Sequence, residues 1–180
     1  MGRHVLEVLR LELDRGGRSD DRIVAMGRTR PAGVPDSSFA SVDLGDAVGL
    51  DAAVRDIAPD FVLHTAGKTP PGTDEELFQA NFWSTVRLLK SIRISGKPVR
   101  VVLSGSAAEL GPVKTADLPV GEDYPCQPMT AYGRSKWMAT VSALAEVGPV
   151  DVSVARMFNL IGPGVPDGQA FGRFAGQLLS

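Results

Sequence analysis

Tyr132 and Lys136 lie four residues apart and are the side chains whose types and spacing first suggest chemistry. On a helix, residues at this spacing share one face. An ammonium group beside a phenol stabilises the phenolate, so a tyrosine in this setting can exchange protons near neutral pH. Such pairs are also common on helix surfaces, as an aromatic at the edge of the core and a solvated amine. The surrounding sequence must decide between these readings.

The chain alternates apolar strands with amphipathic helices. Short apolar runs predict strands over residues 22–26, 61–65, 99–103 and 150–157. Apolar residues at helical spacing predict helices over residues 3–14, 50–57, 75–94, 132–147 and 171–179. Buried strands separated by helices are typical of a parallel sheet with both faces covered. The predicted fold class is α/β, a doubly wound parallel sheet.

Composition narrows the class of protein. The 180 residues are 43% hydrophobic and 22% charged, which suits one soluble globular domain. A net charge of −2 offers no basic surface, so nucleic acid is not an expected partner. The single Cys126 cannot form an internal disulfide, and no signal-peptide or membrane-spanning pattern is seen, so a cytoplasmic location is expected. No Cys/His cluster has metal-ligand spacing, so no metal site is predicted.

The most distinctive residues lie at the ends of the four predicted strands. They are Gly27-Arg28, residues 64–67, residues 104–106 and Phe158-Asn159. In doubly wound sheets, ligands bind beyond the carboxyl ends of the strands. We therefore expect these four strand ends to face one crevice, with Tyr132 and Lys136 on the helix that follows the third.

Five blocks, in this order, resemble the extended short-chain dehydrogenases, the NAD-dependent epimerase/dehydratase family. They are DFVLHTAG at 60–67, Asn81, VVLSGSAAELG at 101–111, AYGRSK at 131–136 and ARMFNLIGPG at 155–164. The resemblance covers nearly the whole chain and implies a Rossmann-like fold. Within the family, FNLIGPG followed by FGRFAGQLL is most similar to the GDP-4-keto-6-deoxy-mannose reductases.

The resemblance implies a catalytic set of three residues. Tyr132 would give or take the proton of a sugar hydroxyl while a hydride moves between that carbon and a nicotinamide. Lys136 would hold the nicotinamide ribose and favour the phenolate. Ser106 would hydrogen-bond the substrate's carbonyl oxygen as it gains negative charge.

The resemblance also implies residues around the cofactor and substrate. Ala66 and Gly67 would offer backbone close to the cofactor, where larger side chains would obstruct it. Asn81 and Phe158 would line the cofactor site, and Asn159 would reach toward the substrate. Two alternatives stay open: Asn81 could hold a loop by hydrogen bonds, and Phe158 could belong to the core.

Cofactor choice is read in the turn after residues 22–26, which contains Arg28 and Arg30 and no carboxylate. In folds of this kind, an acidic residue there pairs with the ribose of NAD, whereas an arginine accommodates the phosphate of NADP. The expected cofactor is NAD(P), with NADP favoured, unless both arginines are solvated loop charges. Asp43 and Leu44 resemble the family's pair beside the adenine.

The start of the chain departs from the family pattern. The family opens with a strand and Gly-x-x-Gly-x-x-Gly, whose amides and helix N-terminus hold the pyrophosphate. Here only Gly2 matches, as the last glycine. The family's first strand would lie between the strands at 22–26 and 61–65, so these are expected to flank an unfilled, aggregation-prone ladder. Because extended members place much of their substrate region further on, residues 1–180 are expected to form one partial domain.

The residues after Ser106 limit the reactions that the protein could catalyse. Sugar-nucleotide 4,6-dehydratases of the family place an Asp-Glu pair there, and this chain has Ala107-Ala108. Keto-sugar reduction or epimerisation of a nucleotide sugar is therefore expected. Glu109 is interpreted as a loop carboxylate, and His64 as a packing residue on the cofactor side.

Two hypotheses for the function of the protein remain open. The first is the NAD(P)-dependent enzyme, with a nucleotide-sugar substrate, no membrane partner and a homodimer through the helices near 75–94 and 132–147. The second is a non-catalytic remnant that acts as an interaction module, since the phosphate-binding loop is missing.

Overall fold

The computed structural model describes residues 2–16, 21–162, 174 and 177. Strands in this part of the chain form two parallel groups. β1 (Ala25–Gly27) pairs with β2 (Phe39–Ser41), and β4 (Val99–Ser106) lies between β3 (Phe61–His64) and β5 (Val150–Met157). Because every pair is parallel, the carboxyl ends of each group meet at one edge. The α/β, doubly wound, Rossmann-like fold class is confirmed.

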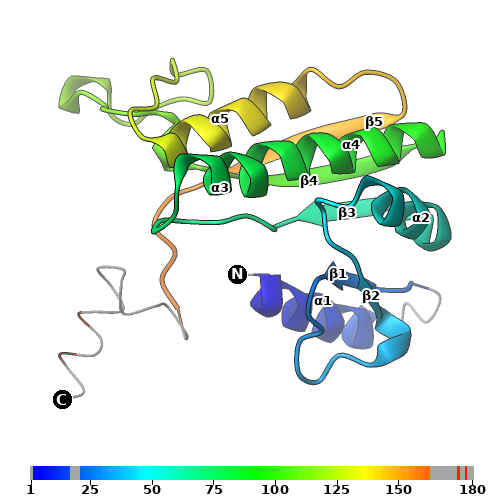
Figure 1. Ribbon diagram of the computed structural model, residues 1–180. Helices are drawn as coiled ribbons and strands as arrows, with labels where there is room; N and C mark the ends of the chain where they lie inside the picture. The colour runs from blue at the N-terminus through cyan, green and yellow to red at the C-terminus, as the bar shows by residue number, and fades with distance from the viewer. Residues whose placement is uncertain (1, 17–20, 163–173, 175–176, 178–180) are drawn as a thin grey trace.

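The described helices alternate with these strands. They are α1 (Gly2–Gly16), α2 (Ala47–Ile57), α3 (Asp74–Phe78), the π-helix η2 (Gln79–Trp83), α4 (Ser84–Ser95) and α5 (Ala131–Leu144), with short 3-10 helices η1 (Asp36–Ser38), η3 (Ala107–Glu109) and η4 (Thr115–Asp117). The helix predicted over residues 75–94 is therefore interrupted by a π-turn. The one predicted over residues 171–179 lies outside the described residues. Figure 1 shows α3, α4 and α5 along one side of β3, β4 and β5.

Polar side chains fix where the helices begin. Asp46 accepts the backbone N–H groups of Val48 and Gly49 at the start of α2, both at 3.1 Å. Thr73 and Glu76 form a reciprocal capping box at α3. Thr130 Oγ1 accepts the Gly133 N–H at 3.0 Å at the start of α5. Each cap satisfies a donor that the first turn leaves unpaired.

The hydrophobic core lies between the helices and one face of the β3-β4-β5 sheet. Alternate residues of β4, Val99, Val101 and Leu103, are at most 3% exposed. They pack with apolar residues of α2, α4 and α5: Leu50, Val54, Leu88, Leu89, Ile92, Ala139 and Ala143. The apolar run predicted as a strand over residues 99–103 thus turns alternate residues toward the helices on this side.

The other side of β3 is open. Phe61 is 71% exposed and Leu63 is 44% exposed. Within the described residues, no strand pairs with the free edge of β3 or of β1, as expected for an unfilled ladder. β1 differs from the strand predicted over residues 22–26, because within the described residues it pairs with β2 alone, over Ala25–Gly27.

Helix α1 buries less apolar surface than the spacing of its apolar residues predicts. Its apolar residues suggested a helix lying on a sheet, but none of its residues is buried, and Val8 and Leu11 are more than half exposed. Arg10 links it to the loop after β1, since Nη1 donates to the Gly33 carbonyl at 3.3 Å. The open position between β1 and β3 leaves α1 with little apolar surface to contact.

We expect Phe61→Glu to reduce self-association of the chain. An unpaired, apolar strand edge is a template for intermolecular pairing, and a charge on it opposes that pairing. The new carboxylate would lie beside Arg100, which faces the Phe61 ring at 5.9 Å. Light scattering against protein concentration measures the effect. Val48→Glu, at a residue 80% exposed on α2, is the control; equal scattering from both variants would contradict the role of the edge.

Candidate active site

Lys136 lies buried at the carboxyl end of β4. Its Nζ donates a hydrogen bond to the Ser104 carbonyl, and the residue is 6% exposed. Burial lowers the pKa of Lys136 below its ordinary value, while the negative charge of Glu109 raises it. The lysine of the predicted pair is therefore held at a strand end and is not a solvated amine.

Close packing sets the start of α5 against the residues that follow β4. A Cβ at Gly133 would lie 2.4 Å from the Ala108 carbonyl oxygen, a backbone atom, and 3.1 Å from Pro128 Cβ. Only glycine permits this approach. Tyr132, the neighbouring residue, is thereby brought to the same end of β4 as Ser106.

The Ser106 and Tyr132 hydroxyls retain free hydrogen-bonding capacity. Ser106 Oγ accepts the Ala108 N–H at 3.2 Å, which leaves its own proton to donate. In the described part of the chain, no residue accepts that proton, and none bonds to the Tyr132 hydroxyl. Both residues are half-buried. The structure thus brings Ser106, Tyr132 and Lys136 to one strand end, and their catalytic roles remain a prediction.

The interpretation of Glu109 as a loop carboxylate is corrected. Glu109 is 0% exposed and closes a capping box, in which its Oε1 accepts the Ser106 N–H at 2.7 Å. Its Oε2 lies 3.3 Å from Arg156 Nε on β5. The pattern Ser-x-x-Glu at residues 106–109 is itself a capping signature, so the local half of this arrangement was readable from the sequence.

Asn81 joins the loop after β3 to α5. Its Oδ1 accepts the Lys68 N–H at 2.8 Å, and its Nδ2 donates to the Lys68 carbonyl and to Ser135 Oγ, both at 3.0 Å. Ser135 Oγ donates in turn to the Tyr132 carbonyl at 2.8 Å. The loop-holding alternative for Asn81 is therefore present in the structure. A cofactor contact for Asn81 remains a prediction.

The packing of Asn81 explains why residue 67 is a glycine. A Cβ at this position would lie 2.6 Å from Asn81 Oδ1. The glycine therefore makes room for the Asn81 amide. Ala66 and Gly67 are exposed, so their backbone also remains open to a ligand.

His64 ends β3 as a buried, neutral side chain. Its Nε2 lies 3.1 Å from Thr85 Oγ1, and Thr85 Oγ1 donates its proton to the Asn81 carbonyl at 2.7 Å. The Nε2 atom must therefore be the donor, which assigns the tautomer. Burial, followed by the positive charge of Lys136, lowers the pKa of His64 to about 4. His64 is thus a packing residue, as interpreted from the sequence.

The residues predicted around the dinucleotide lie at neighbouring strand ends. Gly2 starts α1 beside β3, since a Cβ there would lie 2.9 Å from Thr65 Oγ1. Arg28 follows β1 and Asp43-Leu44 follow β2, and the two strand ends are joined by the Val42 N–H to Gly27 carbonyl bond at 3.0 Å. Asp43 accepts the Gly45 N–H at 2.8 Å, and Leu44 packs against the core.

The two arginines of the first turn differ. Arg30 is tied into its loop, because Nη1 donates to the Val34 carbonyl at 2.7 Å and Nε lies 3.0 Å from Asp36. Arg28 is exposed and makes no ion pair within the described ranges. Of the pair, Arg28 is the one left available for a phosphate group.

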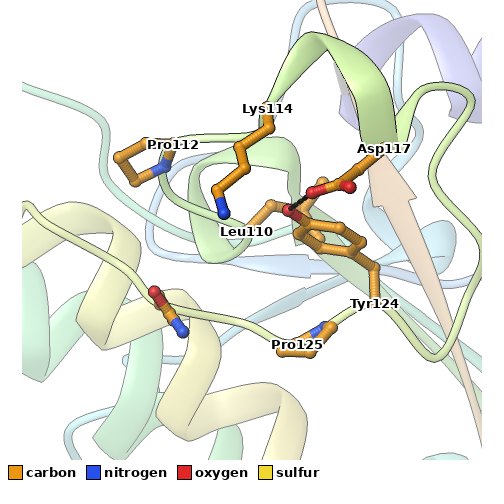
Figure 2. A pocket seen from close by; sticks show the side chains of 7 residues that line it. Leu110, Pro112, Lys114, Asp117, Tyr124 and Pro125 are labelled. Atoms are coloured by element: carbon orange, nitrogen blue, oxygen red, sulfur yellow. Dashed lines mark hydrogen bonds between the residues drawn. The ribbon is translucent and has the colours of Figure 1, made fainter.

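Two hollows flank the loop between β4 and α5. Figure 2 shows one of about 380 Å³, where Tyr124 donates to Asp117 at 3.0 Å beside Lys114. None of the predicted site residues lines it.

The other hollow, of about 640 Å³, runs between α5 and β5, and its lining includes Phe158. Phe158 is 63% exposed, so the alternative that it belongs to the core is wrong. Asn159 beside it is also exposed.

Comparison with known proteins identifies the family. The family model described as NAD dependent epimerase/dehydratase family matches residues 1–179. The chain belongs to the NAD-dependent epimerase/dehydratase family. As a member of this family, it is 31% identical over 162 residues to a dTDP-6-deoxy-L-talose 4-dehydrogenase (NAD(P)(+)) of Kitasatospora kifunensis, covering 87% of the chain and 50% of that protein.

Two further relatives of this epimerase/dehydratase chain extend the comparison. A UDP-glucose 4-epimerase of Azospirillum brasilense is 31% identical over 179 residues, covering 94% of the chain and 49% of that protein. The structure of RMD from Pseudomonas aeruginosa complexed with NADPH has a TM-score of 0.68 at 28% identity, covering 78% of the chain and 51% of RMD. The chain spans about half the length of the curated relatives it matches.

Neither a metal-binding cluster nor a membrane-spanning helix occurs among the described residues. In that part of the chain, no group of three or more His, Cys, Asp or Glu residues is placed to hold a metal ion. None of its helices is both long and apolar enough to cross a membrane.

We expect the free energy of unfolding to fall between pH 6.5 and about 4 because of His64. In the unfolded chain the imidazole binds a proton below pH 6.5, whereas the folded site resists protonation until about pH 4, so acid favours unfolding. The full shift corresponds to about 3 kcal/mol. Urea unfolding of His64→Gln across this range should show a smaller loss. His4→Gln, at the exposed histidine of α1, is the control; equal slopes in both would exclude His64 as the cause.

We expect Gly133→Ala to destabilise the chain although alanine favours helices. The added methyl group would meet the Ala108 carbonyl oxygen at 2.4 Å. Such overpacking costs about 1–3 kcal/mol, more than the gain of up to about 1 kcal/mol from helix propensity. Thermal unfolding gives the measurement. Gly27→Ala, with no atom within 4 Å of its new Cβ, is the control; a Gly133→Ala protein as stable as the parent would disprove this packing argument.

Proposed function

We propose that the protein containing this chain is an NAD(P)-dependent oxidoreductase or epimerase of nucleotide sugars, working through Ser106, Tyr132 and Lys136. The observation that carries the proposal is the arrangement at the end of β4. A buried lysine bonds the Ser104 carbonyl, and two hydroxyls with free hydrogen-bonding capacity lie at the same strand end. Family membership over residues 1–179 supports the same chemistry.

Each of the three side chains has one task. Tyr132 would donate its proton to the sugar oxygen as the carbonyl is reduced, and would accept it in the reverse direction. Lys136 would lower the cost of the phenolate by its positive charge, and Ser106 would donate a hydrogen bond to the oxygen as charge develops. A nicotinamide, when bound, supplies or accepts the hydride.

The candidate site residues fit the nicotinamide ribose of such a cofactor better than its pyrophosphate. Lys136, Asn81 and Phe158 would hold the nicotinamide half, with Ala66 and Gly67 giving backbone access. Gly2, packed on Thr65, would lie at the helix start near the pyrophosphate. Arg28, Asp43 and Leu44 would meet the adenosine, and Arg28, which makes no ion pair with the other described residues, favours NADP over NAD.

Reduction and epimerisation both remain within the proposal. No acid and base follow Ser106 directly, because Ala107 and Ala108 occupy those positions, and dehydration would need both groups. Relatives named as a 4-dehydrogenase and as a 4-epimerase support the two reactions. Asn159 would contact the sugar.

The oligomeric state and the cellular location of the protein are also proposed. A homodimer through the helices near residues 75–94 and 132–147 is supported by exposed apolar side chains, each over 40% exposed: Trp83 on η2, and Met138 and Val141 on α5. A cytoplasmic location remains a prediction. The rival hypothesis of an interaction module is favoured by one observation: within the described residues, no strand pairs with the free edges of β1 and β3.

We expect Tyr132→Phe in the full-length protein to lower turnover of a nucleotide 4-keto-6-deoxy sugar with NADPH about a hundredfold or more, because it removes the acid. Affinity for NADPH, measured by calorimetry, should change little. Tyr124→Phe, at the other tyrosine of the chain, is the matched control. Full turnover in Tyr132→Phe would refute the mechanism, and absence of NADPH and NADH binding in the parent would favour the interaction module.

A further inference from the structure

We propose that Glu109 is a positioning residue, whose carboxylate fixes the end of β4 by holding the Ser106 amide and the Arg156 guanidinium together. The effect on turnover rests on the proposed function of Ser106, Tyr132 and Lys136. The structural effect does not, because it follows from contacts within the chain.

The carboxylate bridges two strands. Glu109 Oε1 accepts the Ser106 N–H at 2.7 Å, and Oε2 lies 3.3 Å from Arg156 Nε. Arg156 pairs in register with Gly105, the residue before Ser106. Its Nη1 also donates to the Glu122 carbonyl at 3.5 Å, so the same arginine contacts the loop that leads to α5. One buried charge thus connects the end of β4, β5 and that loop.

The backbone reserves space for this carboxylate. A Cβ at Gly105 would lie 2.9 Å from Glu109 Oε1 and 2.9 Å from Val154 Cγ1. The carboxylate therefore lies directly against the strand between Ser104 and Ser106. A charge-assisted hydrogen bond at this place holds the strand end more firmly than a neutral one.

The same strand end carries the partner of Lys136. Its Nζ donates to the Ser104 carbonyl, two residues before Ser106. Lys136 faces His64 from β3 and Glu109 from η3, with Tyr132 one turn away on its own helix, and Arg156 pairs with Glu109 from β5. Of these groups, Glu109 is the one whose negative charge favours the ammonium form. Moving or neutralising this carboxylate should change both the position of Ser106 and the ionisation of Lys136.

The test compares Glu109→Gln, Glu109→Ala and the parent chain by NMR. We expect exchange of the Ser106 amide hydrogen to become about tenfold faster or more in Glu109→Ala, since its acceptor is lost, and to rise by a smaller factor in Glu109→Gln, which keeps an uncharged acceptor. The pKa of Lys136, followed by its side-chain signal and assigned with Lys136→Arg, should fall in both variants. Glu75→Gln, at an exposed residue of α3, should change neither.

Glu109→Gln, which keeps the size and shape of the side chain, still tests the proposal if Glu109→Ala does not fold. An unchanged Lys136 titration in Glu109→Gln overturns the electrostatic half of the proposal. Slow exchange of Ser106 in a folded Glu109→Ala overturns the positioning half. A purely structural role would lower stability without moving the Lys136 titration.

Turnover gives a third readout. In the full-length protein, Glu109→Gln should lower kcat, move the alkaline limb of its pH profile to lower pH and leave the KM for NADPH nearly unchanged. If Tyr132→Phe keeps full turnover, the proposed function fails, while the two NMR results still decide the role of Glu109. Unchanged kcat in Glu109→Gln alongside an inactive Tyr132→Phe rejects Glu109 alone.

Discussion

The burial of one ammonium group at the end of β4 constrains most of what surrounds it. Lys136 is 6% exposed, and a buried charge needs polar partners. The Ser104 carbonyl supplies one, and the field of Glu109 supplies a second. Glu109 is itself fully buried, so it needs the Ser106 N–H and Arg156 in turn. Each requirement creates the next one, and together they fix where the strand ends.

A neutral network supports the same end from the other side. His64 donates to Thr85, Thr85 to the Asn81 carbonyl, and the Asn81 amide to Ser135 on α5. The π-turn at η2 places Asn81 among these partners, and such turns are frequent at functional sites. Because His64 stays neutral, it adds no positive charge next to Lys136. The two networks meet at α5, the helix that carries Tyr132.

Local features were readable from the sequence, and long-range pairings were not. The strand predicted over residues 99–103 and the shared face of Tyr132 and Lys136 follow from local patterns, and the structure, in which β4 continues to Ser106, brings them to one place. Asn81 and Ser135 lie 54 residues apart, and Glu109 and Arg156 lie 47 apart, so neither pairing has a local signature. The helix over residues 75–94 was predicted as continuous, because periodicity alone does not reveal a π-turn.

The split between the two strand groups separates two kinds of chemistry. The residues proposed for proton transfer all belong to the β3-β4-β5 group and its helices, where the core is complete on one face. Arg28 and Asp43 belong to the β1-β2 group, which no described strand joins to β3. The proton-transfer geometry therefore depends on contacts within one group, such as Gly133 on Ala108. Binding of the proposed dinucleotide across both groups would depend in addition on how β1 is held relative to β3. Gly2 of α1 lies against Thr65, the residue that follows β3. The proposed acid/base site could thus be intact while affinity for the proposed cofactor varies with this junction, so the two properties should respond to different mutations.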